Sequence, residues 1–110
     1  KAVFFSMNPN KAPGSDGISP LFFQKFWSII KKDLVSAIQG FFHNSAIFKA
    51  INHTVISLIP KVNYPTEIKQ YRPISLCQVV HKALAKILVN RLKPFLFRCI
   101  SKNQSVFVPD

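Results

Sequence analysis

The sequence predicts an α+β fold, because some stretches have the periodicity of a helix and others that of a strand. Residues 21–42 place apolar side chains three and four positions apart, which is the spacing of one helical face. Residues 78–97 repeat this pattern. Between them, two short apolar runs at 55–59 and 74–76 flank a polar loop, as in a β-hairpin. We therefore expect helices, a hairpin and a further helix.

The composition indicates a folded chain with a polyanionic partner. The chain has 110 residues, of which 48% are hydrophobic, so it can bury a core. Fifteen Lys and Arg residues oppose four acidic residues, for a formal net charge of +11. This excess favours nucleic acid over an anionic membrane as the partner. The alternative is a basic ribosome-type domain or a merely soluble one.

Several other classes of protein are disfavoured. No apolar run reaches the ~18 residues of a membrane span, so no membrane partner is predicted. Cys77 and Cys99 lack the spacing of metal ligands, and we expect no metal site. They fit buried thiols of an intracellular protein, nuclear or cytoplasmic and not secreted. Because Lys1 and Asp110 are not typical termini, we also expect a piece of a longer protein.

The first part of the chain reads as a loop followed by helices. Residues 1–18 begin with a short apolar piece and continue into turn-forming pairs, the last of them Asp16-Gly17. Ser19 then has the character of an N-cap, with Pro20 at the first helical position. We predict one long helix or two abutting helices over 19–43, with Asp33 capping the second after Lys31-Lys32.

The hairpin is predicted over residues 54–76. Pro60 and Pro73 are placed at strand ends, where a missing backbone donor costs little. Lys61 leaves the first strand and Arg72 enters the second, so both cations stand at the loop end. A lysine beside a planar arginine suits a polyphosphate. The alternative is that both are solvated strand ends.

The last predicted helix spans 78–97 and is basic. Its apolar face consists of Val80, Leu84, Ile87, Leu88 and Leu92, and its polar face of Lys82, Lys86, Asn90 and Lys93. The lysines can follow a phosphate backbone or simply form a solvated face. Pro94 should kink or end the helix. A short strand is predicted at 106–108, in the tail.

The aromatic pairs are assigned to the core rather than to base-stacking platforms. They are Phe4-Phe5, Phe22-Phe23 and Phe41-Phe42, and each lies among aliphatic residues. No catalytic constellation is visible beside them. The acidic residues Asp16, Asp33, Glu67 and Asp110 are scattered, and no phosphate-binding or nucleophile motif occurs. We expect no catalytic or metal-binding residue, so that the chain alone is inactive.

Five sequence motifs resemble those of a known family. They are NPNKAPGSDGISPLFFQKFW, ISLIPK, YRPISLC, KILVNRLKPFL and SKNQSVFVP. In this order and at these intervals they closely resemble the reverse transcriptases of plant LINE-type (non-LTR) retrotransposons. The resemblance covers essentially the whole chain. It implies that residues 1–110 are a partial reverse transcriptase domain, namely the fingers subdomain of a right-hand polymerase and the beginning of its palm.

The resemblance also implies roles for particular residues. The 54–76 hairpin is the nucleotide side, and Lys61 and Arg72 contact the incoming triphosphate. Residues 1–18 form the template-side loop, with Lys11 and the turn from Gly14 to Gly17 near template RNA. The family usually has proline where this chain has Ser15, which loosens that turn. The 78–97 helix resembles the one packed along the template strand, with Lys82, Lys86, Arg91 and Lys93 as the contacts.

For the parent protein the resemblance implies RNA-directed DNA polymerisation, a nucleotidyltransferase activity. The implied partners are an RNA template, an RNA/DNA hybrid, deoxynucleoside triphosphates, Mg²⁺, and palm and thumb domains absent from this chain. The catalytic aspartates lie downstream in the palm. Two alternatives remain: a stand-alone basic nucleic-acid-binding module, and a truncated, non-functional relic of the element.

Overall fold

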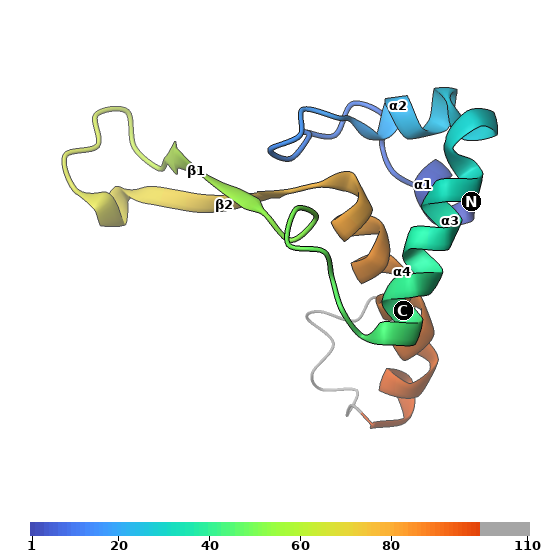
Figure 1. The fold of residues 1–110 in the computed structure, drawn as a ribbon. Coiled ribbons are helices and arrows are strands. Elements are labelled where there is room, and N and C mark those ends of the chain that lie inside the picture. The colour runs from blue at the N-terminus through green and yellow to red at the C-terminus, as the bar shows by residue number, and fades with distance from the viewer. Residues whose placement is uncertain (100–110) are drawn as a thin grey trace.

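The computed structural model describes residues 1–99 and confirms the α+β class. The elements, in chain order, are α1 (Ala2–Phe5), α2 (Pro20–Lys25), α3 (Trp27–Asn44), β1 (Thr54–Pro60), the 3-10 helix η1 (Ile68–Gln70), β2 (Tyr71–Cys77) and α4 (Val79–Cys99). The helices lie together, and the hairpin of β1 and β2 extends away from them (Figure 1). The strand predicted at 106–108 lies outside the described residues.

The predicted helical region 19–43 forms two abutting helices, but the break is not where the sequence indicated it. Ser19 is extended and precedes Pro20 at the first position of α2, as predicted. The backbone leaves the helical conformation at Phe26, with φ −97° and ψ 17°. Asp33 lies inside α3, so its predicted capping role is wrong. Neither Asp33 nor the preceding lysines lacks an amide hydrogen or requires a left-handed backbone, so the helix continues through them.

The core joins the helices to the segment after α1. Its buried members are Phe4, Met7, Phe23, Leu34, Val79 and Ala83. The rings of Phe4 and Phe23 lie 5.4 Å apart between centroids. The core assignment of the aromatic pairs is therefore confirmed for these two rings, whereas Phe5 and Phe22 are exposed, because consecutive residues point in different directions from a helix. Phe41 and Phe42 are half-buried.

The hairpin has the predicted strands and an antiparallel register from Thr54 opposite Cys77 to Pro60 opposite Tyr71. Pro60 ends β1 as predicted, but Pro73 lies inside β2, opposite Leu58. In a two-stranded sheet each strand has one unpaired edge, so β2 can accommodate a residue without an amide hydrogen. None of the residues in β1 and β2 is buried.

Helix α4 is longer than predicted and presents a different apolar face. Val79, Ala83 and Leu84 are buried, whereas Leu88 and Leu92, which were assigned to the core face, are exposed. Pro94 lies inside the helix and does not end it, because α4 continues to Cys99. No helix among residues 1–99 is long and apolar enough to span a membrane.

Candidate functional site

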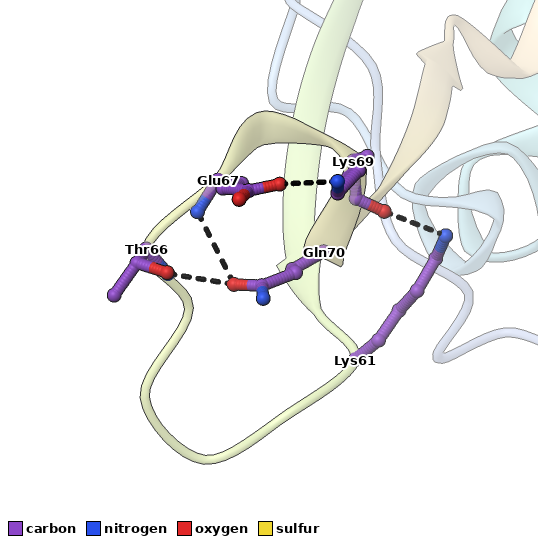
Figure 2. A network of polar contacts seen from close by, with 5 residues as sticks. All are labelled: Lys61, Thr66, Glu67, Lys69 and Gln70. Atoms are coloured by element: carbon purple, nitrogen blue, oxygen red, sulfur yellow. Dashed lines mark hydrogen bonds and ion pairs between the residues drawn. The ribbon is translucent and has the colours of Figure 1, made fainter.

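The tip of the hairpin is closed by a network of backbone and side-chain hydrogen bonds (Figure 2). The Lys61 amide donates to the Gln70 carbonyl at 2.8 Å. The Gln70 side-chain oxygen accepts from the amides of Thr66 at 2.7 Å and Glu67 at 3.2 Å. These bonds surround η1 and tie both ends of the loop together. The loop between the strands therefore has a defined conformation.

The structure places Lys61 and Arg72 at the loop end of the hairpin. Arg72 is opposite Ile59, one pair before the last pair of the ladder, Pro60 opposite Tyr71. Lys61 directly follows β1, and its amide donates to the carbonyl of Gln70, which directly precedes β2. Both side chains are exposed. The hairpin therefore presents two solvent-accessible cations at its loop end.

The two cations differ in how they are held. The Lys61 ammonium donates to the Lys69 carbonyl at 3.0 Å, which uses one of its three hydrogens (Figure 2). Within residues 1–99, the Arg72 guanidinium makes no hydrogen bond or ion pair. The nearby Lys69 ammonium is already paired with the Glu67 carboxylate at 2.6 Å. Arg72 is thus the hairpin cation with the most free donors.

The predicted template-side loop packs against the beginning of α4. A Cβ atom on Gly14 would lie 2.5 Å from the backbone nitrogen of Gln78, so only glycine fits this close approach. Gly17 has φ +69°, a conformation that glycine adopts without strain, and its amide donates to the Gly14 carbonyl at 3.1 Å. The two glycines therefore shape the loop, and Lys11 is an exposed cation on it.

The predicted basic residues of α4 do not form a single surface. Lys82, Lys86 and Lys93 are spaced by four and seven residues, which places them along one side of the helix. Lys82 reaches the loop, where its ammonium donates to the Ala12 carbonyl at 2.8 Å. Arg91 follows Lys82 by nine residues, about two and a half turns, and therefore lies on the opposite side. Its guanidinium stacks 4.6 Å from the centroid of the Phe42 ring, against α3.

One polar residue that sequence reasoning missed joins three segments. Gln78 lies between β2 and α4, and its side-chain amide donates to the Ala50 carbonyl at 2.9 Å and to the Ser15 hydroxyl at 3.4 Å. A glutamine between a strand and a helix is ordinary in sequence. Its partners are 28 and 63 residues away along the chain, so no local pattern could identify it.

The acidic residues do not form a site for Mg²⁺, the ion implied for the parent polymerase. The Asp16 carboxylate accepts from the Ile18 amide at 3.1 Å, Glu67 pairs with Lys69, and Asp33 lies on α3. No group of three potential metal-ligating side chains occurs in the described part of the chain. The described residues therefore do not fit the ion.

A solvent-open groove of about 510 Å³ lies elsewhere, between α3 and the segment after it. Its walls include Asp33, Gly40 and Phe48. None of the predicted nucleotide- or nucleic-acid-binding residues contributes to it. The candidate site is therefore a projecting hairpin and a basic loop–helix surface rather than a cavity.

Comparison with known proteins gives a transposon relative. No protein-family model matches the chain. The chain is 36% identical over 103 residues to the transposon TX1 uncharacterized 149 kDa protein of Xenopus laevis. The matched region is 94% of this chain but only 8% of that protein. The chain is thus similar to a small part of a transposon protein, which supports a relationship to non-LTR retrotransposons.

Proposed function

We propose that the chain is the fingers part, with the beginning of the palm, of the RNA-directed DNA polymerase of a plant LINE-type retrotransposon. In this proposal it binds template RNA, the RNA/DNA hybrid and the incoming deoxynucleoside triphosphate, and supplies no catalytic carboxylate. The observation that carries the proposal is the projecting hairpin, which has the exposed cations Lys61 and Arg72 at its loop end. The relationship to a transposon protein and the +11 charge support it.

In the proposed mechanism the hairpin orients the triphosphate. The Arg72 fork donates two parallel hydrogen bonds to phosphate oxygens, and the Lys61 ammonium adds a point charge beside it. The hydrogen bond from the Lys61 amide to the Gln70 carbonyl closes the loop between the two positions. The palm and thumb, with their Mg²⁺, come from the rest of the parent protein. We place the complex at nuclear DNA, where such an element must insert its copy.

The nucleic acid is held on a second surface, formed by the loop and one side of α4. Lys11, Lys82, Lys86 and Lys93 are the proposed phosphate contacts there. Arg91 is left out of this set, because it lies on the other side of α4 and stacks on Phe42. The proposal therefore gives the three lysines of α4 a role in binding nucleic acid and gives Arg91 none, although all four side chains are basic.

Binding to a labelled RNA/DNA hybrid tests the nucleic-acid part of the proposal. The affinity of the chain should fall with salt, and the slope of log K against log salt should be about 0.7–0.9 per phosphate neutralised. Lys86→Gln should reduce that slope by about one such unit. Arg91→Gln, the matched control on the opposite side of α4, should leave the slope unchanged. Equal effects of the two variants, or binding insensitive to salt, would contradict the proposal.

A stand-alone nucleic-acid-binding module is the second candidate function. The buried cluster around Phe4, Val79 and Ala83 favours it, because a chain with its own core can fold without a partner. It predicts the same salt dependence but no nucleotide site at the hairpin. The third alternative, a relic, predicts aggregation through the exposed apolar side chains of β1 and β2.

A further inference from the structure

The loop before α2 and the base of the hairpin are joined around Gln78. Its side-chain nitrogen donates to the Ser15 hydroxyl of the loop and to the Ala50 carbonyl of the segment before β1. Both hydrogens of this amide are thereby used. The three segments that meet here are far apart in sequence, and Gln78 is the side chain that touches all of them.

Two further contacts strengthen the same junction. Gly14 packs directly on the backbone of Cys77 and Gln78, with no room for a Cβ atom between them. The Lys82 ammonium, one turn further along α4, donates to the Ala12 carbonyl. The loop is therefore fixed to residues 77–82 at three successive points, residues 12, 14 and 15. Lys11 directly precedes the first of them.

We propose that Gln78 is a positioning residue, which holds the loop against the base of the hairpin and so fixes Lys11 and Lys82 relative to Lys61 and Arg72. This inference rests on the proposed function, since it assigns how the template side and the nucleotide side keep their spacing. Without the Gln78 amide, Ser15 and Ala50 lose the side chain that joins them. The loop is then held to α4 by the Gly14 packing and the Lys82–Ala12 hydrogen bond alone, so Lys11 is less firmly positioned and contributes less to binding.

The test compares Gln78→Met with Gln24→Met. Methionine preserves the length of the side chain and removes the donors. Gln24 is a matched control, because its amide also donates to two backbone carbonyls, those of Phe4 and Met7, each at 3.0 Å. Hydrogen exchange of the Gly17 and Ile18 amides should accelerate about three- to tenfold in Gln78→Met, the change expected from one lost hydrogen bond. It should not accelerate selectively in Gln24→Met.

A double-mutant cycle separates positioning from simple loss of stability. Lys11→Gln should weaken binding of the RNA/DNA hybrid in the wild-type chain and have a smaller effect in the Gln78→Met background. In the Gln24→Met background the Lys11 effect should be fully retained. Ser15→Ala, which removes only the loop acceptor, should shift the exchange in the same direction by less. This variant keeps the test decisive if Gln78→Met does not fold.

Additive effects of Lys11 and Gln78, or unchanged loop exchange in both Gln78→Met and Ser15→Ala, would overturn the inference. If the wild-type chain does not bind the hybrid at all, the proposed function fails on that result. The exchange measurement would still report whether the junction holds the loop. The two proposals can therefore fail separately.

Discussion

The helical part of the molecule and the hairpin are stabilised in different ways. In the helical part, Val79 and Ala83 are fully buried and Phe4 is 2% exposed. In the hairpin, Ile56 is 65% and Leu58 49% exposed, and both strands lack a buried residue. The helices are therefore held by the burial of apolar surface, and the hairpin by its backbone ladder and the network at its tip.

This difference shows where a ligand or a larger protein can be contacted. A two-stranded hairpin on its own is at best marginally stable in water, so its position depends on the junction at its base. Its apolar side chains on both faces remain available for contact. The two cations proposed for the triphosphate are on this part of the molecule, while the residues that determine folding are on the other.

The largest expected effect is in the core. Phe4→Ala removes a ring that lies 5.4 Å from Phe23 and 5.7 Å from the Trp27 ring, so it should destabilise the chain by about 3–5 kcal/mol. The hairpin counterpart, Ile56→Ser, should change the free energy of unfolding by only about 0.5 kcal/mol or less. Urea unfolding followed by circular dichroism measures both. Comparable losses would show that the hairpin is packed against other parts of the chain in solution.

A smaller effect is expected where the hairpin base meets the loop. Gly14→Ala introduces a Cβ atom 2.5 Å from the Gln78 nitrogen, and the resulting overpacking should cost about 1–3 kcal/mol. Gly40→Ala is the control, because its Cβ would meet nothing within 4 Å on helix α3. It should stabilise the chain by up to about 1 kcal/mol through helix propensity. Urea unfolding measures both variants as well, and destabilisation by Gly40→Ala alone would contradict this packing.

The sequence predicted the element types well, because periodicity reports which side chains share a face. Both strands and the three longer helical segments follow from it. The position of the α2–α3 break does not, since Phe26 has no distinctive signal, whereas Lys31-Lys32-Asp33 resembles a capped boundary. The position of Pro73 depends on which edge of β2 is unpaired, and a single strand does not contain that information.

For the candidate site, the sequence motifs predicted which basic residues belong to it but not which residues they contact. Helical spacing alone places Arg91 on the opposite side of α4 from Lys82 and Lys86. The resemblance to the family, in contrast, assigned all three to the same contact with the template strand. The loop–hairpin junction was missed, because it depends on contacts between Gln78 and residues distant along the chain. Long-range hydrogen bonds of this kind leave no periodic pattern. The roles of Lys61 and Arg72 remain predictions.

The central claim is tested most directly by nucleotide kinetics of Arg72→Ala in the protein made together with the rest of its reading frame. Losing a charge-assisted contact of about 1.5–3 kcal/mol should lower kcat/KM for the deoxynucleoside triphosphate by tenfold or more, with a raised KM. Lys69→Ala, an exposed cation of the same loop already paired with Glu67, should have little effect. Unchanged kinetics in Arg72→Ala, in an enzyme that incorporates nucleotides normally, would contradict the account.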